Sequence, residues 1–455
     1  MEREKLGSRL GFILLSAGCA IGCGNVWKFP YMCGQYGGGA FVLVYLFFLV
    51  IMGLPALTIE FSLGRASQKS PVKIYKELAP KGSKWQIHGY AAMIGNYVLM
   101  MFYTVVAGWM INYFVNTARG TYSGLSTDEV GAAFSNVCAD PVQMVGYTVF
   151  VIIIGFLVCS IGLQKGLERI TKYMMLILLA VMVRLAVHSF TLGGASEGLE
   201  FYLKPDFGRM KEVGVGNVIV GAMNQAFFTL SLGIGSMAIF GSYIDKKRSL
   251  LGESVSVIIL DTFVALAAGL IIFPACFTYD IEAGAGPGLI FVTLPNVFNN
   301  MPLGGLWGTL FFVFMSFAAL STVFAVFENI LACCMDQFGW SRKKACLINC
   351  IAMIILALPC ALGFNLLSGF QPLGAGTGVL DLEDFIVSNI LLPLGAMTYV
   401  LFATRKRGWG WKNLLAEANA GSGMKLQNWM RGYISYVLPV IIFVLFVVGI
   451  YNYFS

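Results

Sequence analysis

Long apolar runs separated by short polar segments extend along nearly the whole chain of 455 residues. Runs such as 41–59, 142–163 and 433–450 reach the roughly 20 residues with which an α-helix crosses the hydrocarbon of a bilayer. The sequence lacks the ten-residue alternation of apolar and polar positions that is typical of a membrane β-barrel. We therefore expect an all-α polytopic membrane protein with eleven spans, at about 10–33, 39–64, 88–118, 142–163, 170–190, 215–242, 253–279, 306–336, 343–362, 381–403 and 432–453.

The composition excludes a soluble fold. Charged residues make up 12% of the chain, about half of the roughly 25% that is typical of soluble globular proteins. Apolar residues make up 58%, and the mean hydropathy is +0.78. No small-residue cleavage site follows residues 1–9, so we interpret this segment as a cytoplasmic lead-in rather than a signal peptide.

The distribution of Lys and Arg predicts the orientation. An odd number of spans puts the two termini on opposite sides, and 24 of the 30 Lys and Arg residues lie in segments on the side of the N-terminus. The positive-inside rule therefore places the N-terminus in the cytoplasm and the C-terminus outside. Because no predicted outward segment carries an Asn-X-Ser/Thr sequon, we favour a bacterial inner membrane.

The net charge of +7 is explained by this topology and by contact with anionic lipid headgroups. No basic stretch is interleaved with exposed aromatic residues, so a nucleic-acid partner is not expected. The eleven cysteines include no Cys-X-X-Cys pair, and His88 and His188 are the only histidines, so a zinc site is not indicated. The sequence does not indicate an oligomeric state.

Two predicted spans contain polar, glycine-rich interruptions near the middle of the membrane. Span 1 reads GCAIGCGN over residues 18–25, and span 6 reads FTLSLGIGS over 228–236. Glycines alone are equally consistent with close helix packing. If the first ten spans form two halves of five, however, the interruptions occupy matching positions, which indicates a transporter site at the midplane. Unwound backbone there would free carbonyl groups for a cation and NH groups for an anion.

Four acidic residues lie within or at the ends of predicted spans: Glu60, Asp261, Glu328 and Asp336. An acid at this depth costs at least about 2.5 kcal/mol unless it has a partner. We expect Glu60 to support the interrupted backbone by hydrogen bonding. We expect Asp261 to face a bound cation.

Six segments, in order, resemble those of the neurotransmitter:sodium symporter family, especially its bacterial eleven-span amino-acid members. They are RLGFILLSAGCAIGCGNVWKFPY (9–31), GGGAFVLVYLFFLVIMGLPALTIEFSLGR (37–65), QAFFTLSLGIGSM (225–237), Asp261-Thr262, FAALSTVFAVFEN (317–329) and DLEDF (381–385). The resemblance implies one transporter domain over residues 1–455 with a 5+5 inverted-repeat fold and broken helices 1 and 6. Repeat one would cover about 10–190, repeat two about 215–403, and an extra C-terminal helix 11 about 432–453.

The resemblance further implies two sodium sites. The first would be formed by the substrate carboxylate with the carbonyl of Ala20 and the side chains of Asn25, Thr229 and Asp261. The second would be formed by the carbonyls of Gly18, Ile21 and Ala318 with the hydroxyls of Ser321 and Thr322. All of these are hard oxygen donors, which suit an alkali cation. Chloride is expected to be dispensable, because Asp261 can supply a fixed negative charge.

The substrate carboxylate would lie against the NH groups of Cys23 and Gly24 and the hydroxyl of Tyr103. Monoamine carriers of the family hold an aspartate at the position of Gly22, so a glycine there implies a substrate with its own α-carboxylate. The implied substrate residues are Ala20, Gly22, Cys23, Gly24, Leu99, Tyr103, Phe228, Ser231, Ile234, Thr322 and Val326. Their mostly uncharged, apolar side chains predict a bulky hydrophobic or aromatic L-amino acid.

The resemblance also implies two gates. The outer gate would pair Lys28 with Asp384, helped by Gln225, and the inner gate would pair Arg3 with Asp336 near Tyr243. Three positions depart from the family pattern. Lys28 replaces an arginine and loses its planar, two-pronged pairing. Leu6 stands where an aromatic residue is expected, and Leu176 replaces a proline in span 5.

Together these features predict a sodium-coupled amino-acid symporter that works by alternating access. A channel would need rings of charges or carbonyl filters, and an enzyme would need a nucleophile beside a base or a metal. The sequence offers neither arrangement, so we do not expect an enzyme. A non-transporting amino-acid sensor and a symporter of a different small amino acid remain open as alternatives.

Overall fold

The computed structural model describes residues 4–280 and 288–454. Arg3, the predicted partner of Asp336, lies outside these ranges. Within them the chain is nearly all helical, and β-structure is limited to two isolated bridges, Gly38 with Pro205 and Arg248 with Ser422. The expected fold class is therefore confirmed.

Nine continuous helical segments in the described ranges are long and apolar enough to cross a membrane. They are Gly39–Ser67 (α3, η2, α4), Gln86–Ala118 (α6), Pro141–Ser160 (α8), Leu163–Ser189 (η3, α9), Leu250–Thr278 (α14), Gly304–Phe338 (α16), Arg342–Leu362 (α17), Val379–Thr404 (α18, η5, α19) and Asn428–Phe454 (η6, η7, α21). Most of these bounds agree with the predicted spans to within a few residues, because apolar length sets where a helix can cross a bilayer. Span 5 differs, since it begins at Leu163 with a π-helical turn.

Two further crossings are broken where the sequence predicts it. In the first, α1 (Arg9–Ala20) ends before η1 (Gly24–Lys28) and α2 (Phe29–Gln35), and the two parts are bent by 57°. In the sixth, α12 (Val215–Phe228) is separated from α13 (Ser236–Gly241) by non-helical residues. Among the described residues, nine continuous segments and the bent pair are thus long and apolar enough to cross a membrane, and α12 with α13 takes the place of the sixth predicted crossing. The exact bounds of the two repeats stay a prediction.

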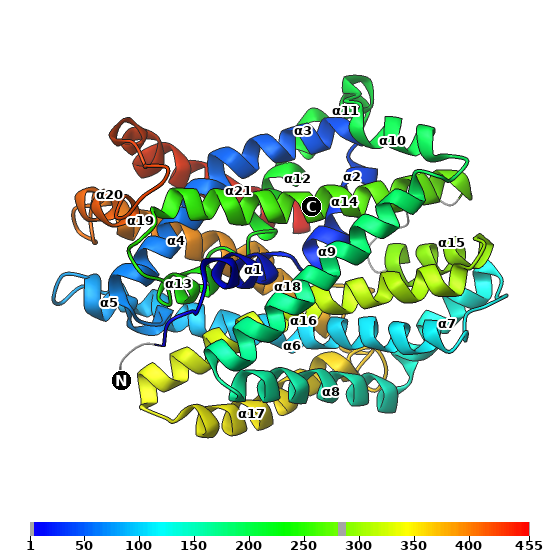
Figure 1. Ribbon diagram of the computed structural model, residues 1–455, viewed down its shortest axis with the longest axis horizontal. Helices are drawn as coiled ribbons and strands as arrows, with labels where there is room; N and C mark the ends of the chain where they lie inside the picture. Colours follow the sequence, from blue (N-terminus) through cyan, green and yellow to red (C-terminus); the bar gives the residue numbers. More distant parts are fainter. Residues whose placement is uncertain (1–3, 281–287, 455) are drawn as a thin grey trace.

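Shorter helices lie at the two ends of the molecule (Figure 1). Near the end that holds the N-terminus are α5 (Pro71–Leu78) and α20 (Trp411–Ala418). At the opposite end are α7 (Thr127–Ala139), α10 (Ala195–Leu203), α11 (Phe207–Val213) and α15 (Leu294–Asn300). In the predicted orientation the first end is cytoplasmic and the second is outside.

The helices differ in how deeply they are buried within the protein. About three quarters of the most apolar stretches of α6 and α16 are buried (72% and 78%), compared with 39% for α8, α17 and the segment of α21. The half-helices α1 and α13 are buried almost throughout. The interrupted helices therefore lie in the protein interior beside α6 and α16. There, backbone groups that the breaks leave without a partner can hydrogen bond to protein groups, which lipid tails could not provide.

Candidate functional site

The two breaks meet at a small cavity, which we call the central cavity. Its volume is about 30 Å³, and its lining comes from both broken spans (α1, η1 and α12 with the breaks that follow α1 and α12), α6, α16 and α19. The lining residues are Cys19, Ala20, Gly22, Gly24, Leu99, Tyr103, Phe228, Thr229, Ser231, Ile234, Thr322 and Leu392. Of the predicted substrate residues, Cys23 and Val326 do not line it. Cys19 and Leu392 line it although the sequence did not point to them.

Close packing explains the glycine at the break of span 1. A Cβ atom on Gly22 would lie 2.5 Å from the Tyr103 hydroxyl and 2.8 Å from the Thr322 hydroxyl. The next residue, Cys23, donates its backbone NH to the Tyr103 hydroxyl over 3.1 Å. The backbone of the break therefore approaches α6 and α16 more closely than any side chain would allow.

The break of span 6 depends on left-handed backbone. Ser231, Gly233 and Gly235 have φ angles of 49°, 103° and 76°. This conformation is costly for residues other than glycine, so Ser231 is a strained position. The freed NH of Gly233 donates to the buried Glu60 carboxylate over 2.6 Å. This hydrogen bond confirms that Glu60 supports the interrupted backbone.

Asn25, Thr229 and Asp261 form the first oxygen cluster beside the central cavity. Asn25 Nδ2 donates to Asp261 Oδ1 over 2.8 Å, and Thr229 Oγ1 donates to Asp261 Oδ2 over 3.1 Å. All three side chains are at most 1% exposed. They combine amide, hydroxyl and carboxylate oxygens, a set that suits a hard cation such as Na⁺. The geometry thus brings together the side chains predicted for the first sodium site.

The second oxygen cluster joins α1 to α16 and comprises Gly18, Ile21, Ala318, Ser321 and Thr322. Ser321 Oγ lies 2.8 Å from the Gly18 carbonyl oxygen and 2.9 Å from that of Ala318. Thr322 Oγ1 lies 3.4 Å from the Ile21 carbonyl oxygen. The contact with Ala318 is an ordinary bond back to the same helix, but the contacts with Gly18 and Ile21 cross to α1 and to the first residue after it.

Residues 4–280 and 288–454 do not offer a site for a transition metal. No group of three or more His, Cys, Asp or Glu side chains in these ranges could hold a metal ion. The second oxygen cluster contains only neutral oxygens, which favour a monovalent over a divalent ion because fewer charges are available to offset dehydration. Both clusters therefore fit Na⁺ better than a transition metal.

The predicted outer gate is only partly assembled. Among the described residues, Lys28 and Asp384 form no ion pair. Lys28 Nζ instead lies 3.9 Å from the centroid of the Phe228 ring, and Asp384 accepts a hydrogen bond from Ser388 over 2.7 Å. The flexible lysine stem allows its ammonium to lie on the ring face. Gln225 links the two broken spans, because its side-chain amide donates to the Gly24 carbonyl over 2.9 Å.

On the predicted cytoplasmic side, a different ion pair is present. Tyr243 donates its hydroxyl to Glu328 over 2.7 Å, and Glu328 pairs with Arg342 over 2.7 Å. Asp336 accepts a hydrogen bond from the Ser70 backbone NH over 2.7 Å. The sequence reasoning singled out Glu328 but did not identify Arg342 as its partner.

Two buried asparagines in α6 and α16 were also missed. Asn96 Nδ2 donates to the carbonyl of Ile234, in the break of span 6, over 2.9 Å. Asn329 Nδ2 donates in turn to Asn96 Oδ1 over 2.9 Å. Their sequence context could have identified them, because an amide side chain inside an apolar span usually hydrogen bonds to another helix.

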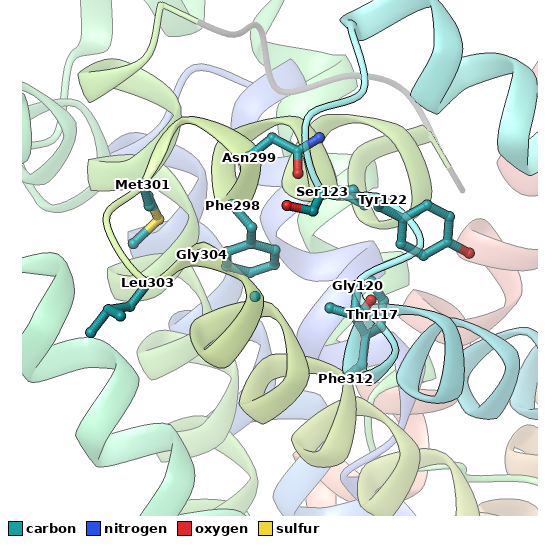
Figure 2. A pocket seen from close by; sticks show the side chains of 12 residues that line it. Thr117, Gly120, Tyr122, Ser123, Phe298, Asn299, Met301, Leu303, Gly304 and Phe312 are labelled. Atoms are coloured by element: carbon teal, nitrogen blue, oxygen red, sulfur yellow. The ribbon is translucent and has the colours of Figure 1, made fainter.

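A second, larger cavity is separate from this site. It has a volume of about 330 Å³ and lies where the end of α6 and the following turn face α15 and the start of α16. Figure 2 shows Phe298, Met301 and Leu303 on one side of it and Thr117 and Ser123 on the other. Its lining holds no ionisable acid or base other than Tyr122 and includes none of the predicted site residues. This cavity is therefore distinct from the predicted site, whose residues gather around the central cavity.

Comparisons with known proteins agree with this fold. The family model described as "Sodium:neurotransmitter symporter family" matches residues 3–145 and 140–455. The chain is similar to YhdH of Bacillus subtilis, described as an uncharacterized sodium-dependent transporter, with 38% identity over 91% of this chain and 90% of that protein. It is also similar to an uncharacterized sodium-dependent transporter of Haemophilus influenzae, with 31% identity over 99% of both chains.

A solved structure shows the same architecture. It is described as MhsT in complex with L-phenylalanine, and it matches this chain with a TM-score of 0.88 and 37% sequence identity. The match covers 98% of this chain and 100% of that one. Family model, relatives and structure therefore agree over almost the entire length. The chain belongs to the sodium:neurotransmitter symporter family and is a sodium-dependent membrane transporter.

Proposed function

We propose that this protein is a sodium-coupled symporter of hydrophobic or aromatic L-amino acids that works by alternating access. The observation that carries the proposal is the meeting of two broken spans at the central cavity, with both oxygen clusters beside it. Such a junction can hold a zwitterion and Na⁺ together, because the carboxylate of the zwitterion completes the coordination of the Na⁺ ion. The relative MhsT, whose description names L-phenylalanine, supports an amino acid as the substrate.

The chemistry of the cavity wall supports this substrate class. No Asp, Glu, Lys, Arg or His lines the central cavity, so nothing there pairs with a charged substrate side chain. A volume of about 30 Å³ exceeds the roughly 10–15 Å³ that one water molecule requires but is much smaller than an aromatic side chain. The proposal therefore requires wall residues to move on binding. We expect Phe228 to move. Its ring is in contact with the flexible Lys28 side chain, which can move with it.

The sodium gradient is sufficient for the proposed task. Two Na⁺ ions entering across about 100 mV release roughly 4.6 kcal/mol. A tenfold sodium gradient adds about 2.8 kcal/mol for two ions. The sum corresponds to about 10⁵-fold accumulation of a zwitterion.

The deciding experiment is uptake by proteoliposomes across a panel of the twenty amino acids, with inward gradients of sodium or of choline. We expect sodium-dependent accumulation of amino acids with large apolar side chains. Accumulation of small residues only would instead support the alternative of a different small amino acid. Tight sodium-dependent binding without counterflow would show a sensor, and uptake that is equal in choline would refute sodium coupling.

Replacing chloride by gluconate is expected to leave uptake unchanged. Asp261 already places a fixed negative charge within hydrogen-bonding distance of Asn25 and Thr229, so a mobile anion is not needed to balance Na⁺. Initial rates in the two media, at equal sodium and membrane potential, provide the measurement. A collapse of uptake in gluconate would show that Asp261 does not fill this role.

Thr322→Val is expected to lower the apparent affinity for sodium about tenfold, which corresponds to roughly 1.4 kcal/mol. The substitution keeps the side-chain shape but removes a hydroxyl that contacts carbonyls of the broken span. Asn25→Ala should have a similar effect at the first oxygen cluster. Thr148→Val is the matched control, because the Thr148 hydroxyl is also buried but bonds only to its own helix at Met144. Wild-type sodium dependence in both site variants would refute the two assignments.

A further inference from the structure

The carbonyl group of Ile234 lies in the break of span 6 and is held from two other helices. Asn96 of α6 donates to it over 2.9 Å, and Asn329 of α16 approaches it at 3.4 Å. The two asparagines are joined directly, since Asn329 Nδ2 donates to Asn96 Oδ1 over 2.9 Å. All three residues are at most 1% exposed. We call Asn96 and Asn329 the amide pair.

The hydrogen-bonding capacity of Asn96 is fully used. Its second amide hydrogen goes to the Ala92 carbonyl of its own helix over 2.7 Å, and its oxygen also accepts from the Ser236 hydroxyl over 3.4 Å. A primary amide offers two donors and two acceptor sites. Because every one of them has a partner, the Asn96 side chain has a single favourable position, and Ile234 is fixed with it.

The side chain of Ile234 is fixed by the residue next to Asn96. A Cβ atom on Gly95 would lie 3.0 Å from Ile234 Cγ2 and 3.3 Å from Leu391 Cδ1. The isoleucine side chain therefore packs directly on the bare backbone of Gly95, while its carbonyl is held by Asn96. Ile234 also lines the central cavity, together with Leu99 one turn further along α6. Neither asparagine is among the lining residues.

We propose that the amide pair and Gly95 are positioning residues that fix Ile234 and thereby set the largest substrate side chain that the cavity accepts. This inference rests on the proposed function, since it assumes an amino-acid substrate in the central cavity. The residues act through Ile234 and do not touch the substrate. A merely structural role would reduce the affinity for all substrates equally, whereas positioning of Ile234 changes the affinity for large substrates relative to small ones.

Two kinds of variant should change this selectivity in opposite directions. Gly95→Ala pushes Ile234 towards the cavity, so we expect the ratio of L-tryptophan to L-leucine affinity to fall about tenfold. Asn96→Leu removes the closer donor to the Ile234 carbonyl, and Asn329→Leu removes the second donor together with the hydrogen bond that holds Asn96. Both changes make this wall more mobile, so we expect the same ratio to rise about fivefold. Dissociation constants for both amino acids, measured at saturating sodium on purified protein, give the ratio.

The matched control is Asn112→Leu. Asn112 lies on the same helix and is equally buried, but its amide donates to Gln143 of α8 over 3.2 Å, far from the breaks. This variant should keep the wild-type ratio. Half-saturating sodium should stay within twofold of wild type in all variants, because the amide pair belongs to neither oxygen cluster. An unchanged ratio in both Gly95→Ala and Asn329→Leu would overturn the inference.

Hydrogen exchange keeps this test separate from that of the proposed function. In ligand-free protein, Asn329→Leu should speed amide exchange over residues 229–236, whereas Asn112→Leu should not. Equal exchange in the two variants would overturn the inference even if no amino acid bound. Failure of the wild-type protein to bind any amino acid in sodium, with exchange changed as expected, would instead overturn the proposed function alone.

Discussion

Gly22→Ala is expected to abolish sodium-dependent amino-acid binding, with a loss of affinity of at least about a hundredfold, or roughly 2.7 kcal/mol. The added Cβ would lie 2.5 Å from the Tyr103 hydroxyl and 2.8 Å from the Thr322 hydroxyl. Neither the Tyr103 nor the Thr322 hydroxyl can move away without losing its own contacts. The tyrosine oxygen ends a rigid ring and accepts the Cys23 NH, and Thr322 belongs to the second oxygen cluster. The substitution therefore disturbs the substrate site and a cation site together.

Gly146→Ala provides the control for this prediction. Gly146 lies in α8, and a Cβ atom there would meet nothing within 4 Å. Binding should remain that of the wild type, because alanine suits a helix better than glycine and nothing is displaced. Equilibrium binding of a labelled amino acid to both purified variants gives the comparison. Near-normal binding by Gly22→Ala would mean that the break of span 1 does not pack against Tyr103 as described.

Arg65→Gln is expected to destabilise the folded protein by about 3–5 kcal/mol, the range typical of breaking one side of a buried ion pair. The Arg65 side chain is fully buried, and its Nε lies 2.7 Å from Glu417 Oε1. It also donates to the backbone carbonyls of Arg248 and Glu417. One guanidinium thus joins the end of α4, the segment between spans 6 and 7, and α20. Glutamine could not reach this set of acceptors, and Glu417 would keep only the mostly exposed Lys246, 2.8 Å from its Oε2, as a charged partner.

Thermal unfolding in detergent, followed by the loss of the monodisperse fraction, measures this effect. Lys204→Gln is the matched control, since Lys204 and Glu200 form an ion pair in which both side chains are mostly exposed. Solvent and salt screen such a pair, so no measurable change is expected. Equal melting temperatures for Arg65→Gln and the wild type would show that the buried pair contributes nothing to stability.

Much of the architecture could be read from local sequence. The bounds predicted for α6 and α16 differ from those observed by at most two residues at either end. The breaks were located because glycines and polar residues interrupt otherwise apolar runs in spans 1 and 6. In a bilayer, backbone groups must be satisfied within the protein, so local hydropathy limits the possible structures more strongly than it does in water.

The contacts that shape the site could not be predicted from the sequence in the same way. Asn96 and Asn329 are 233 residues apart in the chain, yet they share a hydrogen bond. Glu328 was recognised as an unusual acid, but the identity of Arg342 as its partner depends on how α16 packs on α17. Lys28 was expected to pair with an acid, and the structure places it over the Phe228 ring. Each of these outcomes depends on how separate helices are positioned relative to one another.

The sequence by itself determined the membrane-spanning class, the places of the long apolar helices, the two interruptions and, through resemblance, the family. These follow from short stretches of chain, because apolar length and glycine content act locally. The sequence also pointed to Glu60 as a support of the interrupted backbone, but only the tertiary structure decided that it accepts the NH of Gly233 and that Asn96 and Asn329 hold the carbonyl of Ile234. A hydrogen bond between distant segments requires a fixed distance and angle, and only the packing of the helices sets these.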